Sequence, residues 1–354
     1  MKRLNALRII ACTVAVTTLI APPADAAGPI TLKATGSTLM YPLLSSWTLQ
    51  YRGMTPNVRI AIAATGSGAG IAQAIAGTVQ FGASDAYMTD EQVSASPGML
   101  NIPLAISSQL VTYNVPGMNA ASLKLDGPTL AGIYTGSVRS WDDGAIAAMN
   151  PGVKLPHQTI VPIHRNDSSG DSFIFSQYLT FSTDSWEFGP SFGTDVSWPS
   201  VAGAKGANGN DGMVKLLAGT PYGIAYVGGS FFSQVAAAHL GTAMLKNQAG
   251  NFVAPNPRTV RVAAAELGPR TPKDERLSLV FAPGAGSYPL VNYEYAIVAA
   301  KQPDPATAAA LRTFLLWAID EGHGNDQKLL DPLHFASLPE FVRALSDAQI
   351  RKIG

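Results

Sequence analysis

Hydrophobic and polar positions in the first third of the chain follow two repeating patterns. Continuous apolar runs have the length of buried strands, and the stretches after two of them carry apolar residues at helical spacing. The expected strands are 30–34, 58–63, 81–85 and 101–106, and the expected helices are 41–51 and 71–76. Alternating strands and helices are typical of an α/β fold in which helices cover a largely parallel sheet. The pattern therefore predicts that fold class.

The same alternation continues through the rest of the chain. Residues 107–115 are expected to be an extended crossing segment, and the glycine- and proline-rich run 188–211 a long loop that its aromatic residues keep packed. No element is assigned to the proline-rich segment 251–289. Further strands are expected at 159–164, 224–227 and 292–300, and further helices at 130–134, 142–149, 173–179, 211–218, 231–240, 305–320 and after residue 339.

Three of the predicted helices open with turns rich in glycine, serine and threonine. The turns are ATGSTL at 34–39, ATGSGAG at 64–70 and RNDSSGDS at 165–172. The first N–H groups of a helix have no partner within the helix, so they attract anions, and glycine lets a ligand come close to the backbone. Arg165 adds a planar set of donors that suits a tetrahedral oxyanion. Together these features indicate an anion site; the alternative is a capped helix with Arg165 paired to Asp167 on the surface.

Several short motifs occur in an order that resembles a known protein family. They are TL at 38–39, GSGAG at 66–70, FGASDA at 81–86, SWDD at 140–143, RNDSSGD at 165–171, GIAYV at 223–227 and FASLP at 335–339. Together they resemble the motifs of the periplasmic phosphate-binding proteins of bacterial phosphate ABC importers. Each motif alone is weakly specific, whereas their order, spacing and shared chemistry over nearly the whole chain are specific.

The resemblance implies a two-domain α/β periplasmic-binding-protein fold. Each domain is then a central β-sheet flanked by helices, and the ligand lies in the cleft between the domains. Domain one is expected to be discontinuous and to comprise 27–106 plus 290–354, and domain two is expected to comprise 107–289. Two crossings, near Ile106 and Leu290, would join them. This connectivity follows from the resemblance and not from the hydrophobic pattern.

The resemblance also implies a set of phosphate-binding residues. Hydroxyl and backbone N–H groups would replace the water that phosphate loses on burial, and one arginine would supply the full positive charge. The leucine of the set would contribute its N–H alone. The implied ligands are Thr38, Leu39, Ser67, Asp85, Arg165, Ser169, Gly170 and Asp171.

Asp85 is the most informative member of this set. An ionised carboxylate can only accept hydrogen bonds, so it suits an anion that carries its own proton. Phosphate is protonated near neutral pH and sulfate is not, so Asp85 is expected to accept the phosphate O–H and to reject sulfate. The alternative is that Asp85 caps a neighbouring helix.

Asp171 departs from the family pattern, which has threonine after the Ser-Gly pair. The N–H of Asp171 can still donate to phosphate, but its carboxylate cannot. We consider two alternatives: the side chain turns away and caps its own helix, or the site holds two carboxylates and favours a more protonated ligand.

The N-terminal residues 1–26 are predicted to be an export signal. Three basic residues within the first eight precede the apolar run 9–20, and ADA at 24–26 is typical of a cleavage site. The apolar run is shorter than a membrane-spanning helix, and an uncleaved anchor is the alternative. Cleavage after Ala26 would remove Cys12, the only cysteine, and would leave a periplasmic protein without disulfides.

Charge and motif content argue against nucleic-acid binding and against common enzyme classes. The 24 basic and 24 acidic residues become 21 and 23 after cleavage, a net charge of −2, and no basic run is present. TGSG at 65–68 lacks the leading glycine of a nucleophile elbow, no nucleotide-binding fingerprint occurs, and the histidines have no metal-ligand spacing.

The resemblance, together with the predicted anion site, implies a function in phosphate uptake. The chain is expected to bind inorganic phosphate in its interdomain cleft, as a monomer, and to deliver it to the membrane permease subunits of an ABC importer. It is expected to be no enzyme, to use no cofactor and to bind no nucleic acid. The alternatives are a secreted phosphatase and a phosphate-sensing or adhesion module that uses the same anion site.

Overall fold

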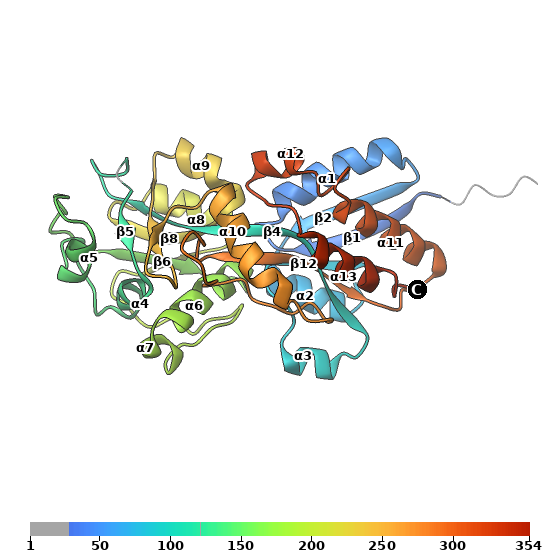
Figure 1. Cartoon of the computed structure of the whole chain (residues 1–354), viewed down its shortest axis with the longest axis horizontal. Coiled ribbons are helices and arrows are strands. Elements are labelled where there is room, and N and C mark those ends of the chain that lie inside the picture. The colour runs from blue at the N-terminus through green and yellow to red at the C-terminus, as the bar shows by residue number, and fades with distance from the viewer. Residues whose placement is uncertain (1–27, 121) are drawn as a thin grey trace, which may run out of the picture.

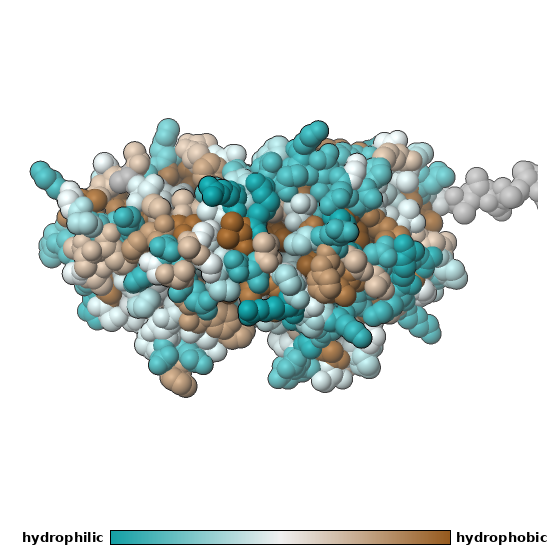
Figure 2. Space-filling model, viewed as in Figure 1, coloured by the Kyte–Doolittle hydropathy of each residue, from teal (hydrophilic) through white to brown (hydrophobic). Residues whose placement is uncertain are grey.

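The computed structural model describes residues 28–120 and 122–354, so the predicted export signal lies outside the described residues. The molecule is elongated, and β4 and β12 run across its middle (Figure 1). Helices α1, α2, α11 and α13 lie toward one end, and α4 to α8 lie toward the other (Figure 1). In the space-filling view the outline narrows between these two parts (Figure 2).

One sheet of nine hydrogen-bonded strands, counted over the described residues, runs through both parts. Its order is β2-β1-β3-β12-β4-β8-β6-β7, and β9 also pairs with β4. The strands are β1 (Ile30–Gly36), β2 (Val58–Ala64), β3 (Phe81–Ser84), β4 (Met99–Asn114), β6 (Val161–Arg165), β7 (Lys205–Ala207), β8 (Gly223–Gly228), β9 (Gly241–Thr242) and β12 (Val291–Ala299). A smaller sheet consists of β5 (Lys124–Leu125), β10 (Met244–Lys246) and β11 (Phe252–Val253).

The prediction of a largely parallel sheet is wrong at the centre of the large sheet. The outer ladders, β2-β1-β3 and β8-β6-β7, are parallel. The inner ladders that β12 forms with β3 and β4, and that β4 forms with β8, are antiparallel. Since a continuous apolar run marks a buried strand without giving its direction, the hydrophobic pattern could not distinguish these ladders.

Strand β4 is the connection between the two parts. It unites the predicted strand 101–106 and the predicted crossing segment 107–115 in 16 continuous residues. From Met99 to Ser108 it pairs with β12, and from Gln109 to Asn114 it pairs with β8. The strand therefore changes partner between Ser108 and Gln109.

Most helices lie close to the predicted positions, but the helices at 90–95, 184–187, 257–267 and 327–330 were not predicted. Helix α10 lies in the segment to which no element was assigned, and Asn256 and Thr259 form a capping box at its start, beside Pro257. The helices are α1 (Tyr41–Met54), α2 (Ser67–Ile75), α3 (Asp90–Ala95), α4 (Gly127–Thr135), α5 (Gly144–Met149), α6 (Gly170–Ser182), α7 (Asp184–Glu187), α8 (Gly209–Ala218), α9 (Phe232–Ala237), α10 (Pro257–Leu267), α11 (Pro305–Ile319), α12 (Gln327–Leu330) and α13 (Glu340–Ile350).

The loop after α7 packs against the second part through Trp198, as predicted from its tryptophan, but Phe188 is 85% exposed and β7 lies inside the predicted loop. Trp198 stacks on His164 with ring centroids 5.3 Å apart and on Tyr226 at 5.8 Å. Tyr226 also stacks on Phe175 of α6 at 4.6 Å. This aromatic cluster fixes α6 against β8, and so fixes the position of the polar residues at the start of α6.

None of the helices in residues 28–120 and 122–354 is both long and apolar enough to cross a membrane.

Candidate functional site

The site has a first face, formed by Ser37, Thr38, Ser67 and Asp85 at the ends of β1, β2 and β3. Asp85 follows β3 directly and is buried. The Ser37 hydroxyl donates to Asp85 Oδ1, and Ser67 Oγ donates to Asp85 Oδ2 over 3.2 Å. The N–H of Asp85 donates in turn to Ser67 Oγ over 3.1 Å. Asp85 therefore accepts from hydroxyl groups of two other segments, and the helix-capping alternative for it is wrong.

Helix α2 begins earlier than predicted, and this places Ser67 within its first turn. Its N-cap is Gly66, whose φ of 92° lies in the region that favours glycine. Gly66 is followed directly by Ser67 at the first helical position, four residues before the predicted start. Close contact with the backbone of Ser168 and with Asp167 further restricts position 66, because a Cβ there would lie 2.5 Å from Ser168 O and 3.0 Å from Asp167 Oδ2.

The second face consists of Arg165, Asp167 and Asp171. Arg165 is only 3% exposed at the end of β6. Its Nε donates to Asp167 Oδ1 over 2.6 Å, its Nη2 also pairs with Asp167, and its Nη1 donates to Asp171 Oδ2 over 2.6 Å. The expected pair with Asp167 exists, but it is buried on the arginine side and not on the surface. Two carboxylates thus share one guanidinium group.

Asp171 does not cap its own helix. The N-cap of α6 is Ser169, whose Oγ accepts from the Ser172 N–H over 3.3 Å. Besides Arg165, the carboxylate of Asp171 accepts from Asn210 Nδ2 over 2.7 Å and from Gln109 Nε2 over 3.1 Å. Of the two alternatives for Asp171, capping is wrong, and its carboxylate is held beside the arginine of the site.

Burial is the main influence on the protonation of Asp171. It raises the pKa of this carboxyl group to about 6, although the charge of Arg165 acts to lower it. The negative charge of Asp85 adds to the increase. Asp171 is therefore ionised at pH 8 and largely protonated at pH 5.

The two faces touch each other directly. A Cβ added to Gly170 would lie 2.5 Å from Ser67 Oγ and 2.6 Å from Asp85 Cβ, so only glycine fits at this contact. Nearby, Asn210 Nδ2 donates to Thr38 Oγ1 over 2.9 Å and also to Asp171 Oδ2. These contacts bring Thr38, Ser67 and Asp85 together with Gly170 and Asp171.

Leu39 and Ser169 complete the predicted set in different ways. The Leu39 side chain is buried and packs against Gly228, and its carbonyl oxygen accepts from Ser230 Oγ over 2.8 Å. Ser169 is fully buried, and its N–H donates to Thr194 O over 2.8 Å. Both lie beside the contact, but their side chains are used for packing and capping.

The sequence did not single out four further polar residues of this region: Ser37, Gln109, Asn210 and Glu294. Ser37 lies inside a turn that was identified, so its hydroxyl could have been included. Asn210 directly precedes a helix whose predicted start was 211, and Gln109 and Glu294 are polar residues within buried strands. A polar side chain in a buried strand is a signal in itself, because it requires a partner.

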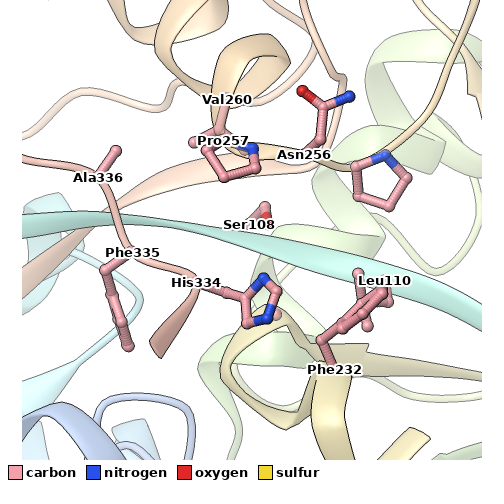
Figure 3. Close-up of a pocket in the computed structure, with 11 residues that line it drawn as sticks. Ser108, Leu110, Phe232, Asn256, Pro257, Val260, His334, Phe335 and Ala336 are labelled. Carbon is pink, nitrogen blue, oxygen red and sulfur yellow. The ribbon is translucent and has the colours of Figure 1, made fainter. Parts of the chain in front are cut away.

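A small cavity lies elsewhere, beside the crossing of β4. Figure 3 shows Ser108 and Leu110 of β4 opposite His334 and Phe335, with the start of α10 above them. It offers about 10 Å³ to the centre of a water molecule, which is room for about one water. We therefore place the candidate site at the contact between the two faces and not in this cavity.

Comparison with known proteins places the chain in a family. Residues 21–321 match the model of the PBP superfamily domain. The chain is 32% identical over 318 residues to the phosphate-binding protein PstS of Xylella fastidiosa strain Temecula1, a match that spans 90% of this chain and 84% of the relative. The chain belongs to the PstS family.

Another PstS relative agrees with this assignment, and a solved structure shares the fold. The chain is 31% identical over 331 residues to PstS of Methanocaldococcus jannaschii, a match that spans 88% of this chain and 84% of the relative. A crystal structure of the phosphate-binding protein of Stenotrophomonas maltophilia superposes with a TM-score of 0.67 at 18% identity, over 90% of this chain and 93% of that one. The fold prediction, a two-domain α/β periplasmic-binding-protein fold, is thereby confirmed.

Proposed function

We propose that this PstS-family protein binds inorganic phosphate between the two faces and delivers it to the permease subunits of an ABC importer. The observation that carries the proposal is the contact of Gly170 with Ser67 and Asp85, because it brings the face with the buried Arg165 against the face with the buried acceptor carboxylate of Asp85. Arg165 supplies positive charge, and Asp85 supplies an acceptor for a protonated ligand oxygen. The names of the relatives support the same ligand.

The ligands that we propose are the eight residues expected from the sequence. Hydroxyl donors and free helix N–H groups surround the anion, and Arg165 keeps donors beyond those that bind Asp167. Leu39 and Asp171 contribute their N–H groups, and Gly170 its small size. The proposed residues are Thr38, Leu39, Ser67, Asp85, Arg165, Ser169, Gly170 and Asp171.

Asp171 acts in this proposal as an internal competitor of the ligand. Its carboxylate lies on Arg165 Nη1, where a phosphate oxygen is expected to bind. Phosphate therefore displaces an ionised carboxylate at high pH, but only a neutral carboxyl group below a pH of about 6. A protonated Asp171 can in addition donate to the anion. Binding is then favoured by acid.

We further propose that the two faces belong to two domains that close on the ligand. Domain one comprises 27–106 plus 290–354, and domain two comprises 107–289. The change of partner of β4 between Ser108 and Gln109 supports a boundary close to this position. A hinge at two crossings lets the faces separate to admit phosphate and meet again around it.

The same proposal places the mature protein, as a monomer, in the periplasm, after cleavage of residues 1–26. In this proposal the chain binds phosphate without turnover, uses no cofactor and has no nucleic-acid partner. A secreted phosphatase remains the second candidate, but no observation on the described residues favours it over binding.

The test is a calorimetric titration of the purified mature chain with phosphate, sulfate and molybdate, together with a turnover assay on an aryl phosphate. We expect saturable one-site binding of phosphate and no release of the aryl alcohol. Sulfate should bind at least about a hundredfold more weakly, because the wrong ligand leaves buried polar groups of the site unpaired. Equal binding of sulfate would contradict the proposed ligand. Steady turnover would show that the protein is a phosphatase and not only a binding protein.

A further inference from the structure

Glu294 is a single acidic residue in the middle of an otherwise uncharged, buried strand. It lies in β12, whose residues 291–298 are all buried, and its own exposure is 0%. A charged side chain is rarely buried in this way without a partner of opposite charge. No ion pair of Glu294 occurs among those found for the described residues.

The position of Glu294 brings its carboxyl group to Asp85. Asn292, two residues earlier in β12, donates from Nδ2 to the backbone oxygen of Asp85 over 2.8 Å. Residues two apart in a strand point to the same side, so Glu294 faces the same segment. The Ser107 hydroxyl of β4 donates to Glu294 Oε1. Glu294 Oε2 is buried, and no hydrogen-bond donor for it is found among the described residues. The carboxyl group of Asp85 lies within hydrogen-bonding reach of the Glu294 carboxyl group.

Two facing carboxyl groups in a buried place cannot both be ionised without a large cost. Burial raises the pKa of Glu294 well above its usual range, and the charge of Asp85 and a hydrogen bond to it raise the pKa further. The Ser107 hydroxyl acts in the opposite direction, and the charge of Asp171 from α6 adds to the increase. Arg165, the cation of the second face, is already paired with Asp167 and Asp171.

We propose that Glu294 is a positioning residue that stays protonated and donates its O–H to the Asp85 carboxylate. This hydrogen bond satisfies Glu294 Oε2, orients Asp85 and leaves the remaining lone pairs of Asp85 for the proton of the ligand. The role in phosphate recognition rests on the function proposed above, whereas the protonated carboxyl group does not depend on it.

The proposal gives the pair Asp85 and Glu294 a charge of −1 instead of −2. An anion binder gains from this, because a second negative charge at the same place would repel the ligand. A cation shared by the carboxyl groups is the obvious competing explanation. In the described part of the chain, however, no group of three or more acidic, histidine or cysteine side chains is arranged to hold a metal ion.

Infrared difference spectroscopy tests the proton directly. Spectra of the ligand-free wild type and Glu294→Gln at pH 8 should differ by one C=O stretching band of a protonated carboxyl group. Asp171 is ionised at this pH, and Glu275, a buried glutamate whose pKa burial raises to about 8, contributes equally to both proteins. A difference spectrum without this band would overturn the proposal.

Phosphate titrations at pH 8 test the positioning role. Gln at 294 can still donate to Asp85, so Glu294→Gln should bind phosphate within about threefold of wild type. Glu294→Met cannot donate and should bind about tenfold more weakly or worse, the scale of one hydrogen bond to a charged group. Glu275→Gln, which changes a buried glutamate bonded to Ser346 away from the site, should bind like wild type.

The outcomes separate this proposal from the proposed function. Wild-type affinity in Glu294→Met, or equal losses in the Gln and Met variants, would overturn the positioning role. If the wild type itself does not bind phosphate, the proposed function fails, and the infrared band still decides whether Glu294 holds the proton. Thermal unfolding of each variant shows that the compared proteins are folded.

Discussion

The two faces of the site offer an anion different groups. The first face, with Ser37, Ser67 and Asp85, offers hydroxyl groups and a carboxylate but no cation. The second face contains Arg165, but two carboxylates already neutralise it. Neither face alone is attractive to a fully ionised anion. This difference indicates that recognition depends on the protonation of the ligand and of Asp171 and on the closure of the two faces, and not on an excess of positive charge.

The largest effect is expected from Arg165, the cation of the second face. Arg165→Ala should weaken phosphate binding by about 2–5 kcal/mol, the scale for removing one partner of a buried charge pair, and it leaves Asp167 and Asp171 without their counter-charge. Calorimetry of the variant checks this. Arg351→Ala, which removes an exposed arginine bound to Asp347, is the matched control and should bind like wild type. Wild-type affinity in Arg165→Ala would remove this arginine from the site.

Gly170→Ala tests whether the two faces must touch. The added Cβ would meet Ser67 and Asp85 across the contact, so the faces could not close fully. Phosphate affinity should fall by about 1–3 kcal/mol, the usual cost of overpacking, while thermal stability of the ligand-free protein changes little because separated faces accommodate alanine. The control is Gly144→Ala at the start of α5, where a Cβ meets nothing within 4 Å. Equal affinities of the two variants would contradict closure at Gly170.

Asp85→Asn tests the selectivity that we assign to the first face. The amide can donate where the carboxylate could only accept, so an unprotonated oxygen becomes acceptable. Sulfate should then bind at least about tenfold more tightly than to wild type, since relieving a like-charge contact is worth more than one such step. Competition titrations with sulfate at pH 8 measure this, and unchanged rejection of sulfate would show that Asp85 is not the selective group.

Asp171→Thr has the smallest expected effect and tests the role of the Asp171 carboxylate in the second face. Because burial raises the pKa of Asp171 to about 6, its carboxylate competes for Arg165 above this pH and stops competing below it. Wild-type affinity, corrected for the ionisation of free phosphate, should rise as the pH falls from 8 to 5. The phosphate affinity of the variant should depend less on pH, and at pH 8 the variant should bind phosphate about threefold to tenfold more tightly than wild type. Parallel profiles at pH 5, 6.5 and 8 would exclude competition by the carboxylate.

The sequence predicted those parts of the molecule that depend on local chemistry. The turn before α6 was identified because polar residues follow a buried strand, and the structure adds that Ser169 caps the helix at Gly170, three residues before its predicted start. Helix α10 does not follow from the hydrophobic pattern because its segment is rich in proline, although Pro257 at a first turn favours a helix.

Other parts could not follow from the sequence because they join distant segments. The antiparallel pairing of β4 and β12 depends on connections and not on the apolar pattern of either strand. The contact of Asn210 with Thr38 spans 172 positions, and Asn292 reaches Asp85 across 207. A single asparagine or glutamate indicates that a partner exists, but only the fold shows which one.

The central claim is that one phosphate ion joins the acceptor of the first face to the arginine of the second. A high-resolution crystal structure of the mature protein with phosphate at pH 8 tests it most directly. The account predicts a phosphate whose oxygens contact Asp85 and Arg165 together, with the Asp171 carboxylate moved away from Arg165 Nη1. A phosphate bound elsewhere, or one that contacts a single face while Asp171 keeps its place on Arg165, would contradict it.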